Sequence, residues 1–183
     1  MIPLSEVGKL RRKYNLTQKE LANLSNVSQS LIAKIEAGTI DPTYTNGQRI
    51  IQTLQELKEK NEPKAADIMN KNIVFASTSD SLKKIIQIMK TKGISQIPVL
   101  SDKNVIGTIT EGTLLNEIIE NPQKLSSKKV LDIMEESPAI VSETTSVRIV
   151  SQLLRSNPVV LVATKGEVKG IISKTDLLQM ISQ

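Results

Sequence analysis

An internal repeat is the feature that most constrains how this chain can fold. The tripeptide "DIM" occurs twice, and its aspartates, Asp67 and Asp132, are sixty-five positions apart. At this offset residues 65–82 align with residues 130–147 without a gap, and from Gly107 and Gly170 onward the offset is sixty-three. A unit of about sixty residues exposes much of its apolar surface when it is alone. The repeat therefore predicts two similar units that pack against each other.

Both copies show the same order of elements. An amphipathic helix, "SLKKIIQIMKTKG" or "SVRIVSQLLRSN", is followed by two apolar strands around a polar turn, "QIPVLSDKNVIGTIT" or "VVLVATKGEVKGIIS". A short helix closes each copy, and a short helix that begins near the "DIM" aspartate opens it. The pattern predicts helix, strand, helix, strand, strand, helix, twice over.

The first sixty residues have a different pattern, typical of short helices. Thr17 and Glu20 have the spacing of a capping box at a helix start. Ser28 is a good N-cap for a second helix, and Gly38 suits the left-handed residue that ends one. A longer amphipathic helix follows and ends near the polar segment "KEKNEPK". We expect a small helical bundle that contains two helices joined by a tight turn.

The second of these helices carries an outward polar face. Gln29, Ser30 and Lys34 fall on this face, opposite the apolar positions Ile32 and Ile35. Gln pairs with adenine, Ser reaches several base edges, and Lys suits guanine or a phosphate, so the face has the chemistry that a DNA major groove requires. A simple solvated face of a bundle is the alternative interpretation.

Residues 4–57 resemble the helix-turn-helix domains of the Cro and phage-repressor family. The resemblance implies that Gln18 grips a DNA phosphate, and that the helix beginning at Ser28 enters the major groove with Gln29, Ser30 and Lys34.

The same resemblance implies a structural ion pair between Arg11 and Glu36. The sequence departs from the family at Leu31, where a small polar residue is usual; Leu31 is expected either to touch a thymine methyl group or to pack on a neighbouring segment.

Residues 64–183 resemble a pair of cystathionine-β-synthase (CBS) domains, on the segments "GISQIPV", "VIGTIT" and "GIISKTD". The resemblance implies two clefts that take an adenosine-containing ligand such as AMP, ADP, ATP or S-adenosylmethionine. In the family a Ser or Thr meets the phosphate, and an Asp three residues later accepts the ribose hydroxyls. Ser173 and Asp176 match these positions.

The first copy matches only in part, with Thr110 followed by Thr113 in place of the Asp. We expect its cleft to bind nucleotide less well, or to bind something else. In the second copy, Ile140, Ser142 and Val160 are expected to surround the base. The alternative for Ser173 and Asp176 is an ordinary helix start without any ligand.

The predicted fold class is an α plus α/β two-domain protein. An all-α helix-turn-helix bundle occupies residues 1–62, and a tandem module of β-α-β-β-α repeats follows, with one CBS domain over residues 63–123 and the other over residues 124–183.

The composition argues against an enzyme. The sequence has no Cys and no His, so it cannot build a Ser-His-Asp or Cys-His nucleophile by itself, and a metal site would need carboxylates and carbonyls alone. We predict no catalytic residues, no catalytic cofactor and no metal. There is no apolar run near the roughly 20 residues that span a membrane and no signal-peptide pattern, so we expect a cytoplasmic protein. A net charge of +5 favours a polyanionic partner only weakly.

Together these features predict a ligand-responsive transcriptional regulator that binds double-stranded DNA and senses an adenine nucleotide or a related small molecule. We expect a homodimer, because one small helix-turn-helix makes few base contacts and specificity normally requires two half-sites. Two alternatives stay open: a scaffold or dimerisation protein with a ligand-free CBS pair, and a regulatory subunit of a metabolic enzyme.

Overall fold

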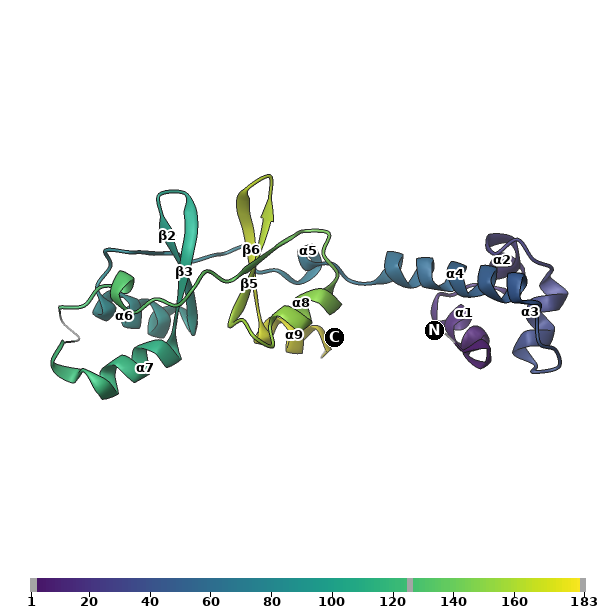
Figure 1. Cartoon of the computed structure of the whole chain (residues 1–183), viewed down its shortest axis with the longest axis horizontal. Helices are drawn as coiled ribbons and strands as arrows, with labels where there is room; N and C mark the ends of the chain where they lie inside the picture. The colour runs from purple at the N-terminus through teal and green to yellow at the C-terminus, as the bar shows by residue number, and fades with distance from the viewer. Residues whose placement is uncertain (1–2, 125–126, 182–183) are drawn as a thin grey trace. The chain divides into compact units, whose positions relative to one another are not determined.

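In the computed structural model, which describes residues 3–124 and 127–181, the chain divides between Glu62 and Pro63 into two units (Figure 1). The outer limits of the predicted domains, residues 1 and 183, lie outside the described residues. No helix in the described ranges is both long enough and apolar enough to cross a membrane.

The first unit is helical, and side-chain caps set where its central helices begin. Its elements are η1 (Leu4–Glu6), α1 (Val7–Lys13), α2 (Gln18–Leu24), α3 (Gln29–Glu36) and α4 (Tyr44–Asn61). The Thr17 hydroxyl accepts a hydrogen bond from Glu20 N, and the Glu20 carboxylate accepts one from Thr17 N at 2.7 Å, so the predicted capping box is confirmed. The Ser28 hydroxyl caps α3 by accepting from Leu31 N at 3.2 Å.

A tight backbone turn ends α3. Gly38 adopts a left-handed φ of +68°, as the sequence predicts. Gly38 N donates to Ile35 O at 3.0 Å and Thr39 N donates to Lys34 O at 2.9 Å, which is the hydrogen-bond pattern of a Schellman motif. The bounds of α3 are therefore fixed at both ends by local sequence.

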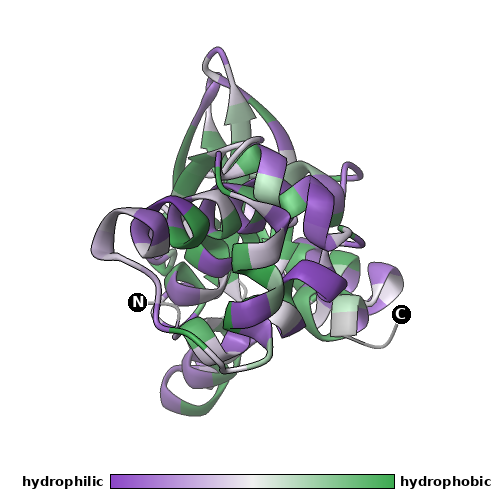
Figure 2. Cartoon of the chain, turned by 90° about the vertical axis from the view of Figure 1, so that its right-hand side faces the viewer, coloured by the Kyte–Doolittle hydropathy of each residue, from purple (hydrophilic) through white to green (hydrophobic). Residues whose placement is uncertain are grey.

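The apolar sides of the helices pack together to form the core of the first unit. Leu31, the departure from the family pattern, is partly buried and packs against this core. Figure 2 shows the corresponding alternation of hydrophobic and hydrophilic positions along the ribbon. The buried residues are Val7, Leu21, Ala22, Ile32, Ile35, Ile50 and Leu54.

The second unit contains the predicted order of elements twice. The first copy has α5 (Ala65–Ile68), β1 (Ala76–Ser77), α6 (Leu82–Lys92), β2 (Gln96–Ser101), β3 (Asn104–Thr110) and α7 (Glu111–Glu120). The short 3-10 helix η2 (Pro122–Lys124) follows it. The second copy has a 3-10 turn, η3 (Val130–Asp132), and then β4 (Ala139–Ser142), α8 (Val147–Leu153), β5 (Val159–Thr164), β6 (Glu167–Ser173) and α9 (Lys174–Ile181).

Each copy forms a three-stranded sheet with the same topology. The first strand pairs parallel with the second. The second and third strands form an antiparallel hairpin, β2 with β3 and β5 with β6 (Figure 1). Both hairpins shift register at equivalent positions, at Val99/Leu100 and at Val162/Ala163. The two copies are therefore structural repeats. Even the irregularity in the hydrogen-bond ladder of the hairpin is the same in both.

The two copies exchange their opening segments. α5 belongs to the first copy in sequence, yet Ala65, Ile68 and Met69 pack into the core of the second copy. The corresponding residues of the second copy, Val130, Ile133 and Met134, pack into the core of the first. The "DIM" aspartates fix the exchanged turns: Asp67 accepts from Lys64 N at 2.7 Å, and Asp132 accepts from Lys129 N at 2.8 Å.

A glycine in each hairpin makes room for the exchanged segment. A Cβ atom at Gly107 would lie 2.7 Å from Glu135 O, and one at Gly170 would lie 2.7 Å from Met69 Cβ. Backbone bridges then connect Glu135 to Thr108 and Asn70 to Ile171. Neither repeat has a complete core without the other.

Candidate functional sites

The exposed side of α3 carries the polar residues that the sequence singles out. Ser28, Gln29, Ser30 and Lys34 are all exposed, while Ile32 and Ile35 on the opposite side are buried. The Ser28 and Ser30 hydroxyl oxygens lie 3.3 Å apart at the start of the helix. The structure thus brings these four residues onto one accessible surface.

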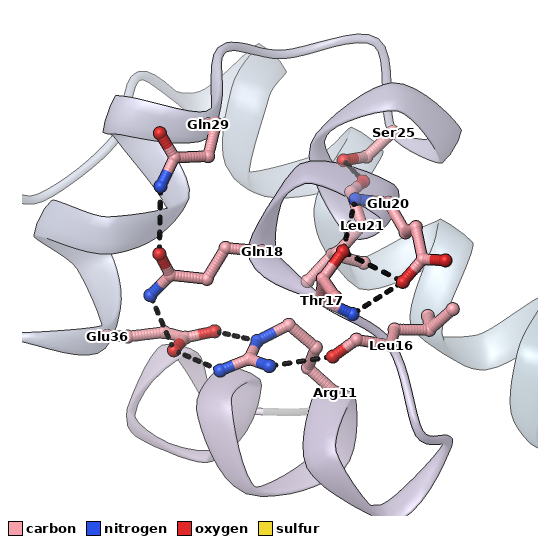
Figure 3. A network of polar contacts seen from close by, with 9 residues as sticks. All are labelled: Arg11, Leu16, Thr17, Gln18, Glu20, Leu21, Ser25, Gln29 and Glu36. Carbon is pink, nitrogen blue, oxygen red and sulfur yellow. Dashed lines mark hydrogen bonds and ion pairs between the residues drawn. The ribbon is translucent and has the colours of Figure 1, made fainter.

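A continuous chain of hydrogen bonds connects this surface to the interior (Figure 3). Gln29 Nε2 donates to Gln18 Oε1 at 3.0 Å, and Gln18 Nε2 donates to Glu36 Oε2 at 3.1 Å. Glu36 in turn accepts from Arg11 Nε at 2.6 Å and from Arg11 Nη2 at 2.8 Å. Gln18 is therefore held from both ends of its amide, and its position relative to Gln29 is fixed.

The Arg11–Glu36 ion pair holds α1 and the end of α3 together. The two side chains are only 12% and 9% exposed, and Arg11 Nη1 also donates to Leu16 O at 2.7 Å. The hydrogen bond from Arg11 lowers the pKa of the Glu36 carboxyl, against the opposing effect of burial, and the same contact raises the pKa of Arg11. Both groups are thus kept charged.

A shallow hollow lies between the beginnings of α2 and α3. Gln18, Ser28 and Gln29 line it, together with Lys19 and Asn23. Asn23 is a residue that sequence reasoning missed, because it falls on α2 outside the recognised polar face. It adds an amide to the surface around Gln18.

In the second unit, Ser173 and Asp176 line a cleft of about 260 Å³. Asp176 Oδ2 accepts from Ser173 N at 2.7 Å and from Ser173 Oγ at 2.6 Å. These two bonds use one carboxylate oxygen and orient the other, Oδ1. A half-buried carboxylate held in this way can accept hydrogen bonds from a ligand that has two adjacent hydroxyl groups.

Much of this cleft comes from the first copy, which sequence reasoning did not assign to it. Asn70, Asn72 and Val74 follow the exchanged helix α5 along one wall, and residues 93–96 connect the end of α6 to the start of β2. Val159 and Ile171 supply apolar surface, and Thr175 lies beside Asp176. The segment "GISQ" within "GISQIPV" was the available signal for residues 93–96.

The residues expected around the base do not line this cleft. Val160 is fully buried in the core of the second copy, because side chains alternate along a strand and its neighbour Val159 takes the cleft side. Ile140 is 52% exposed and outside the lining, and Ser142 bonds to the Thr144 and Thr145 hydroxyls. These three residues stay a prediction, and the described lining of this cleft does not include them.

The equivalent residues of the first copy, Thr110 and Thr113, make a different set of contacts. Their hydroxyl oxygens lie 2.7 Å apart, and Thr113 N donates to Thr110 Oγ1 at 3.0 Å. Thr110 Oγ1 also donates to Glu135 Oε1 at 3.1 Å, and Thr113 Oγ1 donates to the same oxygen. Sequence reasoning missed Glu135.

Among residues 3–124 and 127–181, no cluster of three or more acidic side chains is arranged to hold a metal ion. The polar groups that are brought together on α3 and beside Asp176 are suited to hydrogen bonding and charge pairing. The geometry of both places is that of a binding module.

Comparison with known families agrees with this class. A CBS domain model matches residues 65–120 and 130–183, and a helix-turn-helix model matches residues 7–58. The chain belongs to the CBS-domain family, with a helix-turn-helix domain preceding its CBS pair. The predicted recognition and fold class are confirmed.

Named relatives match over part of this chain. Zinc metalloprotease MJ0392 of Methanocaldococcus jannaschii is 30% identical over 119 residues, which is 65% of this chain and 32% of the relative. UPF0053 protein YrkA of Bacillus subtilis is 27% identical over 157 residues, 78% of this chain and 35% of its own length. The chain thus spans about a third of the length of these two relatives.

Solved structures share the fold of the second unit. CBSX2 of Arabidopsis thaliana, a CBS-pair protein, superposes with a TM-score of 0.59 at 20% identity, over 67% of this chain and 96% of its own. A structure of CBSX2 in complex with AMP has a TM-score of 0.56 at 22% identity, over 66% of this chain and 97% of that one.

Proposed function

We propose that this chain is a ligand-responsive transcriptional regulator, in which the first unit binds double-stranded DNA and the CBS pair binds an adenosine-containing metabolite. The observation that carries the proposal is the exposed polar face of α3, which hydrogen bonds connect through Gln18 to Glu36. This face belongs to a helix-turn-helix domain that is joined in one chain to a CBS pair. In this proposal neither part contributes a catalytic group. The proposal also places the protein in the cytoplasm.

DNA recognition would use the exposed face of α3 together with Gln18. Gln29, Ser30 and Lys34 would face base edges, since Gln suits adenine and Lys suits guanine. Gln18 and the α3 start at Ser28 would hold the phosphate backbone, which positions the reading helix without reading sequence. The Arg11–Glu36 pair would contribute rigidity to this frame.

Nucleotide binding would use the cleft at Asp176. Its carboxylate would accept both hydroxyls of a ribose, and Ser173 would lie near the phosphate. The apolar residues Val159 and Ile171 would contact the base in place of Ile140, Ser142 and Val160. The AMP complex of CBSX2 supports AMP as the first ligand to test.

A homodimer would supply the second half-site. The helices that flank the hairpins expose apolar side chains in both copies: Leu115 and Ile119 on α7 are 54% and 69% exposed, and Leu178 on α9 is 65% exposed. Exposed apolar patches on helices are typical of association surfaces. We expect light scattering to give twice the chain mass, and Ile119→Lys to shift the population toward the monomer; an unchanged dimer would place the contact elsewhere.

Selection of bound duplexes from a random pool tests the DNA-binding proposal. We expect a palindromic site, because a symmetric dimer presents two equivalent reading helices. Gln29→Ala with Lys34→Ala should weaken binding to that site by about 1–3 kcal/mol for each lost base contact, with the fold intact. Lys83→Ala, an exposed change in α6, is the control.

The outcomes separate the candidate functions. A palindrome with unchanged affinity of the double variant would show that another surface reads the DNA. No enrichment of any duplex, together with no calorimetric heat from AMP, ATP or S-adenosylmethionine, would favour a scaffold. Retention of a metabolic enzyme without retention of DNA would favour a regulatory subunit.

A further inference from the structure

Asn70 lines the cleft that contains Asp176, and its side-chain amide has a fixed orientation. Asn72 N donates to Asn70 Oδ1 at 2.9 Å. A backbone N–H group can only donate, so the amide atom of Asn70 that faces it must be the oxygen. The amide nitrogen, Nδ2, makes no hydrogen bond within the described part of the chain. Asn70 therefore offers the cleft a hydrogen-bond donor whose direction is already set.

The backbone of Asn70 is fixed as well. Asn70 N donates to Ile171 O at 2.9 Å, and Ile171 N donates to Asn70 O at 3.0 Å. Asn72 and Gln96 also line the cleft, but within residues 3–124 and 127–181 no hydrogen bond orients their side-chain amides. A donor that is oriented beforehand loses little conformational freedom when a ligand binds. Asn70 is thus better suited than the other two amides to discriminate between ligands.

The bridge to Ile171 places Asn70 beside the apolar part of the cleft. Ile171 and Ser173 are two residues apart on β6, so their side chains lie on the same face of the strand, with Cα atoms roughly 6.5 Å apart. Asp176 is hydrogen-bonded to Ser173, whereas Asn70 is bridged to Ile171. In the proposed function, a ribose bound to Asp176 leaves the base beside Ile171, with one edge toward Asn70.

We infer that Asn70 is the residue that reads the base, by donating a hydrogen bond from Nδ2 to a ring nitrogen. Adenine suits this donor, because its unprotonated ring nitrogens are acceptors. A base without the acceptor would leave the amide unpaired, which is how polar sites reject close analogues of their ligands. The inference rests on the proposed nucleotide-binding function and adds to it a residue that determines specificity.

Calorimetry with AMP on the full-length protein tests the inference through two substitutions. Asn70→Asp keeps an oxygen that can accept from Asn72 N and removes the donor, whereas Asn70→Ala removes both. We expect both variants to bind AMP roughly three- to tenfold more weakly than the natural protein. Loss of AMP affinity in Asn70→Ala alone would overturn the inference, because Asn70 would then only shape the turn.

A matched control accounts for the charge that Asn70→Asp introduces. Asn104 is an exposed residue at the start of β3 and is not part of the described lining of the cleft. Asn104→Asp makes the same change of charge in the same unit and should bind AMP as the natural protein does.

Analogues of AMP identify the acceptor atom. The compounds 1-deaza-AMP, 3-deaza-AMP and 7-deaza-AMP each have carbon in place of one ring nitrogen. We expect one of them to bind the natural protein roughly three- to tenfold more weakly than AMP, and to bind Asn70→Asp about as tightly as AMP does. The added carboxylate affects AMP and its analogues alike, so its charge cancels from this comparison.

The remaining outcomes distinguish this inference from the proposed function. AMP binding that is weakened in Asp176→Asn and unchanged in Asn70→Asp would overturn the inference and leave the proposed function standing. An analogue that loses its disadvantage in Asn72→Asp, and keeps it in Asn70→Asp, would assign the base contact to Asn72 and overturn the inference too. Equal binding of AMP and all three analogues by the natural protein would do the same. No binding of AMP to the natural protein would overturn both the inference and the proposed nucleotide binding.

Discussion

At the scale of single residues, Glu36 organises the surface proposed to read DNA. Its two oxygens accept three hydrogen bonds, two from Arg11 and one from Gln18, and its side chain is 9% exposed. A nearly buried carboxylate is favourable only while such partners are present, because an unpaired buried charge is costly. The geometry at Gln18 and Gln29 therefore depends on a residue that touches no base in the proposal.

Replacing Glu36 by Gln should destabilise the first unit by about 1.5–3 kcal/mol at neutral pH, the range for a hydrogen bond to a charged group. Tyrosine fluorescence during urea unfolding measures this change selectively, because Tyr14 and Tyr44 are the two tyrosines of the sequence and both lie in the first unit. Glu56→Gln, in an exposed part of α4, is the control. Equal unfolding midpoints for Glu36→Gln and the natural protein would contradict the stabilising role.

The same variant carries a pH dependence with a definite sign. Because Arg11 lowers the pKa of Glu36, its stabilisation is complete above the ordinary glutamate value of about 4.3 and is lost as the pH falls through the lower, folded value. The difference between the natural protein and Glu36→Gln should therefore shrink toward acid pH.

The pairing of Arg11 with Glu36 could be expected from sequence, since both residues stand at positions of a known motif. The contact of Glu135 with Thr113 could not. The repeat offset shows which residues are equivalent, but it does not show which residues of one copy touch the other. The offset identifies Thr113 as the residue that stands where the second copy has an Asp, but its contact Glu135 lies twenty-two residues further along the chain.

At the scale of elements, the exchange of α5 and η3 depends on close approach to the hairpins. Gly170 lies against the Met69 side chain, and Gly107 lies against both Met134 and the backbone of Glu135. The exchange thus rests on two glycines at equivalent positions of β3 and β6.

Gly170→Ala should destabilise the second unit by roughly 1–3 kcal/mol, because its Cβ would overlap Met69 and overpacking of this kind forces neighbours to shift. Circular dichroism during urea unfolding measures the change. Gly112→Ala in α7, whose Cβ would have its nearest neighbour at an ordinary 3.6 Å, is the matched control and should be neutral or slightly stabilising. Equal losses in both variants would contradict the close-approach explanation.

Caps, turns and strand order could be predicted because they depend on neighbouring residues. Thr17, Ser28 and Gly38 take the roles that their spacing indicates. The side of β5 that meets the cleft could not be predicted, since Val159 and Val160 are equally apolar and only their register in the sheet separates them.

At the scale of the whole molecule, each unit has its own core. The first residues of the second unit already take part in its hydrogen bonding. Pro63 O accepts from Val147 N at 2.8 Å, and Ala65 N donates to Thr145 O at 2.8 Å. A fragment of residues 63–183, which keeps these bonds, is therefore expected to unfold cooperatively.

A fragment of residues 72–183 should be less stable by at least about 2–5 kcal/mol, the cost of removing one large buried apolar side chain, because it lacks Ile68 and Met69. Urea unfolding followed by circular dichroism compares the two fragments. Equal midpoints would show that the exchanged segment contributes no stability to the second copy.

The path of residues 63–74 has a thermodynamic consequence. This stretch leaves the first unit, is hydrogen-bonded to the turn before α8, and continues as the wall of the cleft that contains Asn70, Asn72 and Asp176. In the proposed function, one covalent segment would thus be both the tether of the unit that binds DNA and a surface that the ligand contacts. Coupling through such a segment is reciprocal: whatever factor AMP imposes on operator affinity, operator DNA must impose on AMP affinity. The affinity of the regulator for its metabolite would then depend on whether operator DNA is bound.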